Sequence, residues 1–266
     1  MAYAGDELSG AWNFRDVAEQ TGIAPGRFFR ASELSRLDDA GRAALRGFAV
    51  TDVADLRTLR ELERHGPGLV PDGVDIHHLP FVETTVSDDE APHEHAFKRM
   101  MTEKSDDESV ADAAARYMTE EYGRIASAPL AQRAVREVVT LLGSGRRVLA
   151  HCFAGKDRTG FTTAVVLEAA GVGRDAVMAD YLRSNEAVPQ LRESILANLR
   201  ERAAESPEVL DLAEARLTDS VLGVREQYLA TAMRTLDDQF GSLAGYLEAS
   251  GVTPTDLDHL RARLQG

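Results

Sequence analysis

The chain has 266 residues, enough for one large domain to bury a core without disulfides or metal ions. With 44% hydrophobic and 28% charged residues, it has the composition of a folded protein rather than a disordered one. Its formal net charge of −14 disfavours binding to nucleic acid or to an anionic membrane surface, because phosphate contacts require clustered lysine and arginine. Cys152 is the single cysteine, which excludes an intrachain disulfide and a cysteine-based zinc cluster.

No apolar stretch of the sequence has the length that a bilayer-spanning helix requires. The N-terminal residues also lack the basic and apolar regions of a signal peptide. We therefore expect a protein without integral membrane association, either cytoplasmic or exported without a recognisable signal peptide.

The first half of the chain alternates β-rich runs with helical patterns. The predicted strands cover residues 28–30, 50–56, 75–79 and 147–150. Helices are predicted at residues 38–45 and after Thr58, whose spacing to Glu61 is that of a capping box. This alternation is typical of a parallel sheet with crossover helices, so the predicted fold class is α/β.

The rest of the chain is mostly helical in pattern. Residues 83–107 are acidic and polar, and we expect a long loop there that either forms a solvated surface or borders a site. The predicted helices cover residues 111–125, 131–142, 161–170, 175–182, 225–240, 243–249 and 254–264. Because no repeat and no glycine-, serine- or proline-rich linker divides the sequence, a single domain over residues 1–266 is predicted.

One charged helical segment carries a narrow apolar stripe. Its members recur at every fourth position and are Leu191, Ile195, Leu199 and Ala203. Ser206 and Pro207 then have the N-cap and N1 pattern of a further helix. By itself, the stripe is also what a surface helix uses for ordinary packing on a core.

The most informative segment is the decapeptide His-Cys-Phe-Ala-Gly-Lys-Asp-Arg-Thr-Gly that begins at His151. It lies between a predicted strand and a predicted helix, where a loop turns its backbone N–H groups towards one point and forms an anion cradle. Arg158 can then donate two parallel hydrogen bonds to a tetrahedral oxyanion. The predicted phosphate-binding residues are Phe153, Ala154, Gly155, Lys156, Thr159 and Gly160.

Three side chains of this segment are candidates for catalysis: Cys152, Asp157 and Arg158. The helix N-terminus and Arg158 favour the thiolate of Cys152, a nucleophile suited to phosphoryl transfer. Asp157 is the nearest carboxylate in sequence and is predicted to protonate the leaving group and then to activate water. Thr159 is predicted to donate a hydrogen bond to the sulfur, and His151 to orient the loop. This chemistry calls for no metal ion and no cofactor.

Each of these residues alone has an ordinary structural interpretation. A lone cysteine is usually a small buried hydrophobic residue, and a lone arginine usually lies on a solvated surface. Here they occur together at fixed spacing, with glycines beside them, after a strand and before a helix. The combination favours phosphoryl transfer over a structural role.

The decapeptide resembles the signature of the cysteine-dependent protein-tyrosine phosphatases, and its Gly-Lys-Asp-Arg-Thr-Gly part is similar to the bacterial tyrosine/serine phosphatase branch. Further blocks that resemble this branch are Trp-Asn-Phe-Arg-Asp-Val from Trp12, Phe-Arg-Ala-Ser-Glu-Leu from Phe29 and Ala-Asp-Leu-Arg from Ala54. Residues 180–189 and 241–247 resemble its C-terminal blocks. The similarity thus runs nearly from end to end of the chain.

The resemblance implies a phosphatase-type α/β fold with a central parallel sheet surrounded by helices and a C-terminal helical lid at about residues 186–222. It implies hydrolysis of phosphotyrosine, and also of phosphoserine and phosphothreonine, through a cysteinyl phosphate that releases inorganic phosphate. The alternative is a phosphoinositide phosphatase that uses the same site. The expected partners are therefore a phosphoprotein or a phosphoinositide, and not a nucleic acid.

Several residues near the motif have two interpretations. Lys156 is either a second cation for highly anionic head groups or a solvated side chain at the rim of the loop. Asp55 ends a predicted strand, where it either holds Arg158 in place or makes a local hydrogen bond. Three residues of the first block are expected to form a structural hydrogen-bond cluster near the sheet: Asn13, Arg15 and Asp16.

The predicted general acid has one competitor. Many tyrosine phosphatases carry their general acid on a Trp-Pro-Asp loop, and this tripeptide does not occur in the chain. Glu83 is the first carboxylate after the Leu-Pro-Phe run at residues 79–81, and it either reaches the site from its loop or is a surface charge. Asp157 remains the predicted acid.

Two other functional classes compete with an active phosphatase. Sulfurtransferases of the rhodanese type also carry a cysteine loop at a strand end, but they do not need the Arg-Thr-Gly start of a helix; a thiosulfate assay separates the two. A phosphate-reading module with an inactive site is disfavoured because the nucleophile, the arginine and the acid are all present.

Overall fold

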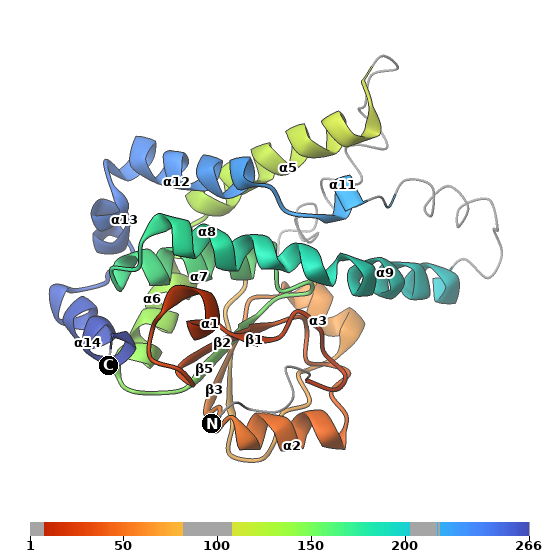
Figure 1. Ribbon diagram of the computed structural model, residues 1–266, viewed down its shortest axis with the longest axis horizontal. Helices are drawn as coiled ribbons and strands as arrows, with labels where there is room; N and C mark the ends of the chain where they lie inside the picture. Colours follow the sequence, from red (N-terminus) through yellow and green to blue (C-terminus); the bar gives the residue numbers. More distant parts are fainter. Residues whose placement is uncertain (1–7, 82–107, 203–216, 218, 266) are drawn as a thin grey trace.

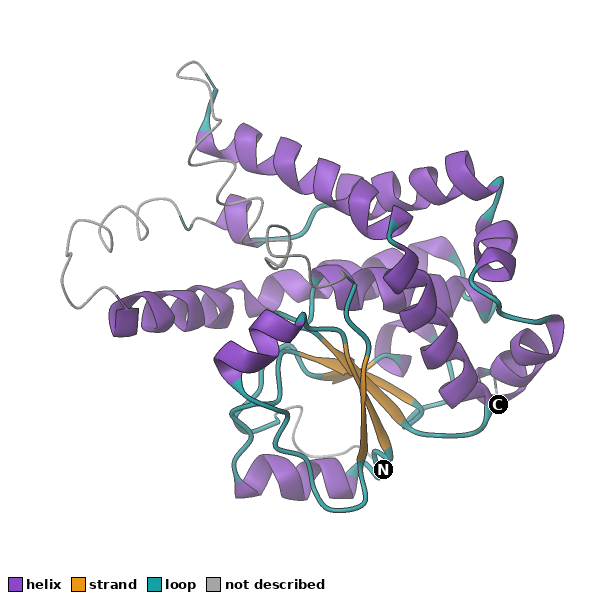
Figure 2. Cartoon of the chain, turned by 180° about the vertical axis from the view of Figure 1, so that it is seen from behind, coloured by secondary structure: helices purple, strands orange, loops and turns teal. Residues whose placement is uncertain are grey.

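The computed structural model describes residues 8–81, 108–202, 217 and 219–265. One five-stranded sheet lies between two layers of helices (Figures 1 and 2). The strands are β1 (Arg15–Asp16), β2 (Phe28–Ala31), β3 (Asp52–Asp55), β4 (Asp75–His78) and β5 (Val148–His151). Their order across the sheet is β1-β2-β5-β3-β4.

The sheet is mixed rather than wholly parallel. Strands β2, β5, β3 and β4 run parallel, as the alternating sequence pattern predicts. Strand β1 is antiparallel to β2, with Arg15 opposite Arg30. The sequence does not predict β1, because two charged residues carry no β-strand pattern. The α/β fold class is confirmed with this correction.

Strand β5 lies in the middle of the sheet. Its last residue, His151, is opposite Ala31 at the end of β2 and Asp55 at the end of β3. The carboxyl ends of three parallel strands therefore meet where the decapeptide begins. In α/β folds this edge of the sheet is where functional residues gather.

Helices cover both faces of the sheet. In the first part of the chain they are α1 (Ala18–Thr21), α2 (Asp39–Gly47), α3 (Leu59–His65), α5 (Val110–Ser127) and α6 (Pro129–Gly143). After β5 they are α7 (Asp157–Ala169), α8 (Arg174–Leu182), the 3-10 helix η1 (Arg183–Ala187), α9 (Val188–Arg202), α11 (Asp219–Leu222), α12 (Glu226–Phe240), α13 (Leu243–Ala249) and α14 (Pro254–Leu264). Helix α12 packs along α5, and α9 continues the line of α8 (Figure 1).

The two faces of the sheet bury different sets of side chains. Successive residues of a strand point to opposite faces, so Val148 and Ala150 join the large core beneath α5, α6 and α7. Leu149 points the other way and joins Phe29 and Leu45 in a smaller core beneath α2. Both faces of β5 are thus covered, which fixes the point from which the motif leaves the sheet.

Most predicted elements are confirmed, with small shifts at their ends. The helix predicted at residues 38–45 is α2, with Asp38 as its N-cap, and the predicted capping box between Thr58 and Glu61 opens α3. Helix α7 begins at Asp157, inside the motif, rather than at residue 161. The sequence does not predict α1, η1 or α11, which are too short to show a helical period.

The predicted loop at residues 83–107 and the predicted helix start at Ser206 and Pro207 lie outside the described residues. None of the described helices combines the length and the apolar composition needed to cross a membrane.

Candidate active site

The motif forms a tight loop between β5 and α7. Gly155 has φ +65°, and a Cβ at this position would lie 2.1 Å from the carbonyl oxygen of Ala31. A Cβ on Gly160, in the first turn of α7, would lie 2.9 Å from the ring of Tyr181. Only glycine fits Gly155 without moving the backbone of β2, so the loop is held closely against the sheet.

The loop is anchored through its carbonyl oxygens. Asn13 Nδ2 donates to the carbonyls of Ala154 and Gly155, at 3.0 Å each. Arg30 Nη2 donates to the same Gly155 carbonyl at 2.7 Å. Because the C=O and N–H of a trans peptide point in opposite directions, the N–H groups that follow these carbonyls face away from Asn13 and Arg30. This is the backbone arrangement that an anion cradle needs.

Two buried arginines behind the loop share one carboxylate. Asp180 accepts from Arg15 Nε at 2.7 Å and from Arg30 Nη1 at 2.6 Å. Burial and the charge of Arg30 lower the pKa of Arg15 to about 10, although Asp180 opposes this shift. The three side chains together carry a net positive charge, which favours an anion in the neighbouring loop.

The predicted structural cluster of the first block is confirmed in part. Asn13 Oδ1 accepts a hydrogen bond of 2.6 Å from Arg15 Nη1, so these two residues act together. Asp16 instead accepts from the backbone N–H groups of Ala18 and Gly26, at 3.0 and 2.6 Å, in a separate turn.

Cys152 lies at the start of the loop, with 2% of its surface exposed. His151 precedes it, and its Nδ1 lies 3.2 Å from the Cys152 carbonyl oxygen. Burial lowers the pKa of His151, although the charge of Asp55 opposes the shift. The position of His151 fits the predicted orienting role.

Arg158 is held by Glu61, which the sequence indicates only as a helix cap. Arg158 Nη1 and Nη2 donate to the two carboxylate oxygens of Glu61 at 2.6 and 2.7 Å, and Nη1 also donates to the Leu56 carbonyl at 3.1 Å. Burial lowers the pKa of Arg158, but the charges of Glu61 and Cys152 outweigh burial and raise it above its ordinary value. Its Nε is buried without a hydrogen-bond partner among the described residues, so this N–H is available to an oxyanion.

Asp55 does not hold Arg158, and this interpretation is corrected. Its carboxylate instead accepts from Arg57 Nη2 at 2.7 Å, and its Oδ2 lies 3.6 Å from His151 Nε2. Burial raises the pKa of Asp55, but the charges of His151 and Arg57 outweigh it and lower the pKa to about 2. The alternative, a local bond at the strand end, is confirmed.

Asp157 is the first residue of α7 and is buried. Its Oδ1 accepts a hydrogen bond of 3.0 Å from the hydroxyl of Tyr122 on α5 and lies 3.8 Å from Lys156 Nζ. The hydroxyl of Tyr181 on α8 in turn donates to that of Tyr122 at 2.7 Å. No sequence pattern assigns a role to these two tyrosines, since Tyr122 lies in no motif and Tyr181 lies only in the C-terminal block at residues 180–189.

Lys156 is not a solvated side chain at the rim, and that interpretation is wrong. It is 2% exposed, and its Nζ donates to the carbonyl of Leu222.

Thr159 Oγ1 is buried without a hydrogen-bond partner in the described part of the chain, so the predicted bond from Thr159 to the Cys152 sulfur is not formed. Glu83, the competing acid, lies outside the described residues.

An apolar cluster covers the loop. Phe153 and Ala154 from the loop pack with residues of α9 and of the segment around α11: Val188, Leu191, Leu196, Leu217 and Leu222. Of the predicted stripe, Leu191 is buried in this cluster and Ile195 and Leu199 pack against it, while Ala203 lies outside the described residues. The stripe therefore packs over the cysteine loop.

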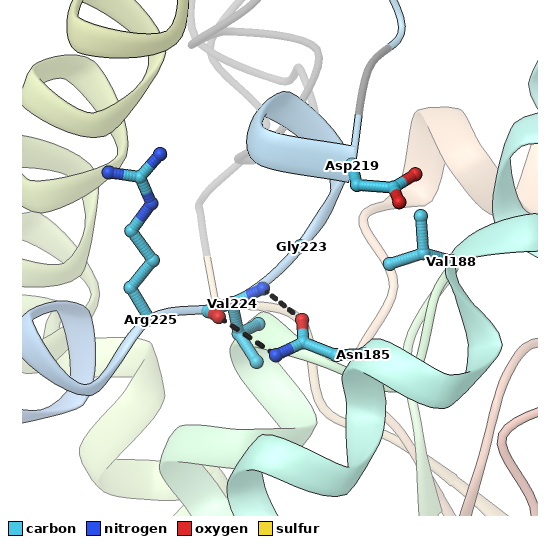
Figure 3. Close-up of a pocket in the computed structure, with 6 residues that line it drawn as sticks. All are labelled: Asn185, Val188, Asp219, Gly223, Val224 and Arg225. Carbon is cyan, nitrogen blue, oxygen red and sulfur yellow. Dashed lines mark hydrogen bonds between the residues drawn. The ribbon is translucent and has the colours of Figure 1, made fainter.

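The Asn185 side chain joins two segments at the base of this apolar cover. Asn185 Oδ1 accepts from the Val224 N–H at 2.7 Å, and its Nδ2 donates to the Val224 carbonyl at 3.1 Å (Figure 3). These bonds link η1, which leads into α9, to the chain that leaves α11. A pocket of about 280 Å³ lies here, lined by Asn185, Val188, Asp219, Gly223, Val224 and Arg225.

Comparison with known proteins agrees with this geometry. A family model described as the tyrosine phosphatase family matches residues 6–266. The chain is 54% identical over 272 residues to the triple specificity protein phosphatase PtpB of Mycobacterium tuberculosis, covering 98% of this chain and 99% of the relative. It is 27% identical over 246 residues to a tyrosine-protein phosphatase of Nostoc commune, covering 92% of this chain and 76% of the relative. The match across the chain and the cysteine loop at the centre of the sheet show that the chain belongs to the tyrosine phosphatase family of enzymes.

Proposed function

We propose that the chain hydrolyses phosphate monoesters of proteins, phosphotyrosine together with phosphoserine and phosphothreonine, through a phosphoryl group carried on Cys152. The observation that carries the proposal is the buried Arg158 Nε, which has no hydrogen-bond partner among the described residues. A buried N–H of a charged group costs free energy unless a ligand satisfies it. A phosphoryl oxygen bound in the loop supplies that acceptor.

In the first step, the Cys152 thiolate attacks phosphorus while the bond between phosphorus and the ester oxygen breaks. Asp157 gives its proton to the departing oxygen, so the alcohol or phenol leaves neutral. Arg158 and the loop N–H groups bind the phosphoryl oxygens, whose charge is highest in the transition state.

In the second step, Asp157 accepts a proton from a water molecule that attacks the cysteinyl phosphate. The bond between sulfur and phosphorus breaks, and its electron pair returns to Cys152 as the thiolate. Inorganic phosphate leaves and Asp157 is protonated again, so atoms and charges balance over the cycle.

Of the lid expected at about residues 186–222, residues 203–216 and 218 lie outside the described residues; the proposal that this segment is a lid therefore rests on residues 186–202, 217 and 219–222. The support is that Cys152, Lys156 and Arg158 are each 2% exposed while α9 packs over the loop. A phosphopeptide can reach the sulfur only if this cover moves. When the cover opens, substrate reaches Cys152, and when it closes, it separates the site from bulk water.

A phosphoinositide is the second candidate substrate. Lys156 supports it, because a second cation in the loop suits a head group with several phosphates. The Lys156 amine is bonded to the Leu222 carbonyl in the covered state, so movement of the cover frees it.

The test is a comparison of kcat/KM for phosphotyrosine, phosphoserine and phosphothreonine peptides and for soluble phosphoinositides. We expect turnover of all three peptides by the wild-type chain and none by Cys152→Ser. Hydrolysis at a near wild-type rate by Cys152→Ser contradicts the proposal. A phosphoinositide kcat/KM far above that of every peptide favours the second candidate.

A further inference from the structure

A chain of buried hydroxyl groups ends at Asp157. Tyr181 Oη donates to Tyr122 Oη at 2.7 Å, and Tyr122 Oη donates to Asp157 Oδ1 at 3.0 Å. The two tyrosines come from α8 and α5, which both lie outside the motif in sequence. Neither belongs to the cysteine loop, so their convergence on this one carboxylate is produced by the tertiary fold.

The ring of Tyr122 is fixed by its neighbours. It is fully buried, packs edge-on against Tyr181 with centroids 6.2 Å apart, and lies tilted against Tyr228 with centroids 5.6 Å apart. A ring held on two sides cannot turn without disturbing both partners. Its hydroxyl is therefore at a defined point beside Asp157.

Both hydroxyls keep their protons. Burial, followed by the negative charge of Asp157, raises the pKa of Tyr122 and of Tyr181 well above the ordinary tyrosine value. Because Tyr122 accepts from Tyr181, its own proton is directed to Asp157. The direction of the chain is thus set from Tyr181 to the carboxylate.

This arrangement makes the two oxygens of Asp157 different. Oδ1 is occupied by the Tyr122 donor and lies 3.8 Å from the Lys156 ammonium, and both contacts favour negative charge on that oxygen. Oδ2 accepts no hydrogen bond from the part of the chain that the structure describes. The proton that Asp157 carries therefore belongs on Oδ2.

We propose that Tyr122, fixed by Tyr181, is a positioning residue that holds Asp157 Oδ1 so that Oδ2 gives and takes the catalytic proton. This inference rests on the proposed function, in which Asp157 is the general acid and base. Tyr122 itself exchanges no proton with the substrate.

The chain offers a matched control. Tyr228 belongs to the same cluster and touches the Tyr122 ring, but its hydroxyl has no hydrogen-bond partner in the part of the chain that the structure describes. Tyr228→Phe removes a buried hydroxyl beside the same ring without breaking the hydroxyl chain. Tyr122→Phe removes the hydroxyl that bonds Asp157 and keeps the ring.

The experiment measures kcat and kcat/KM for p-nitrophenyl phosphate and for a phosphoserine peptide. The p-nitrophenolate leaves without a proton, so Tyr122→Phe should leave its kcat/KM within about 2-fold of wild type. The serine oxygen needs the proton, and kcat/KM for the peptide should fall about 10-fold, a fraction of the 10² or more that general acid catalysis supplies.

The second step gives a separate readout. With p-nitrophenyl phosphate, kcat and KM of Tyr122→Phe should fall together, because breakdown of the cysteinyl phosphate still needs the base. A merely structural loosening changes kcat/KM for both substrates alike. Tyr181→Phe should act in the same direction with a smaller effect, and Tyr228→Phe should match wild type.

A double-mutant cycle tests whether Tyr122 acts through Asp157. In an Asp157→Asn background, Tyr122→Phe should cause no further loss, because the positioned group is already absent. Equal losses for both substrates, or additive effects in the cycle, overturn the inference. If Tyr122→Phe does not fold, as judged by circular dichroism, the same cycle with Tyr181→Phe decides.

If the proposed function itself is wrong, the kinetics of the Asp157→Asn variant show it separately. If Asp157→Asn itself slows both substrates equally, Asp157 is not the general acid, and the inference falls with that assignment. If Asp157→Asn shows the leaving-group dependence and neither tyrosine variant does, only the positioning role is wrong.

Discussion

Arg158 is oriented by the protein itself, because both terminal nitrogens of its guanidinium donate to Glu61. The Nε–H of the same guanidinium is buried without a hydrogen-bond partner among the described residues. We expect Arg158→Lys to lower kcat/KM by about 100-fold or more, because lysine has no counterpart of the buried Nε–H and the loss of one transition-state donor costs that much.

Steady-state kinetics with p-nitrophenyl phosphate check this prediction. Arg174→Lys is the control, since Arg174 is exposed and pairs with Glu168 on the surface. Near wild-type activity in Arg158→Lys would refute the assignment of Arg158 as the transition-state clamp.

Asp55 should make a pH-dependent contribution to stability. Its folded pKa is about 2, below the ordinary 3.8, so the contribution is present above pH 4 and is lost as the pH falls from about 4 to about 2. The shift corresponds to about 2 kcal/mol at neutral pH. The gap in unfolding free energy between wild type and Asp55→Asn should therefore shrink on acidification.

Urea unfolding of both proteins at pH 6 and at pH 3 measures this gap. A gap that stays constant or grows at pH 3 would show that the Asp55 carboxylate is not selectively stabilised in the folded protein.

Asp55 and Glu61 also show how much of a single residue's role can be predicted from the sequence. Glu61 is visible as the last member of a capping box, and it does cap Thr58, with a bond of 2.8 Å to the Thr58 N–H. Its bonds to Arg158 join positions 97 residues apart, which no local pattern encodes. For the same reason the sequence offers Asp55 as one possible partner of Arg158 but gives Glu61 only a capping role, and it carries no sign of Tyr122.

At the level of elements, α9 is the helix that bears most directly on access to Cys152, because it packs over the cysteine loop. Leu191 is buried against the cluster that contains Phe153 and Ala154. Leu191→Ala should weaken this packing, since truncating a buried leucine typically costs about 2–5 kcal/mol. The cover should then open more often, and peroxide should inactivate Cys152 several times faster, while kcat/KM for p-nitrophenyl phosphate is kept or raised.

The control is Glu193→Ala on the same helix, since the Glu193 side chain is 69% exposed and pairs with Arg200 at the surface. The measurement is the rate of activity loss in a fixed peroxide concentration. If Leu191→Ala folds and loses activity no faster than wild type and Glu193→Ala, α9 does not control access to the sulfur.

The elements were predictable where their patterns are long or capped. Helices α13 and α14 have the predicted bounds, because Ser242 and Thr253 cap them and each keeps a helical period. Strand β1 has two residues and α11 has four, so neither repeats a pattern often enough to be recognised. Their formation depends on neighbours that the fold brings to them.

At the level of the whole molecule, the sheet order explains why the site lies where it does. Strand β5 separates β2 from β3, so residues of the N-terminal block, of α3 and of the motif meet at one edge of the sheet. Arg30 comes from β2, Glu61 from α3 and Asp180 from α8, and all three are buried around the loop. The strand-loop-helix motif in the sequence predicts the cysteine loop at the centre of the site. The buried side chains that support the loop come together only through the topology of the sheet.

The central claim is that Cys152 carries the phosphoryl group during turnover. The most direct measurement is rapid acid quenching of Asp157→Asn with p-nitrophenyl phosphate, followed by mass spectrometry of the peptide that contains Cys152. This variant forms the intermediate with a good leaving group and hydrolyses it slowly. We predict one phosphoryl group on Cys152, formed with a burst of p-nitrophenolate and absent in Cys152→Ser. Turnover with neither a burst nor a phosphorylated Cys152 peptide would contradict the account.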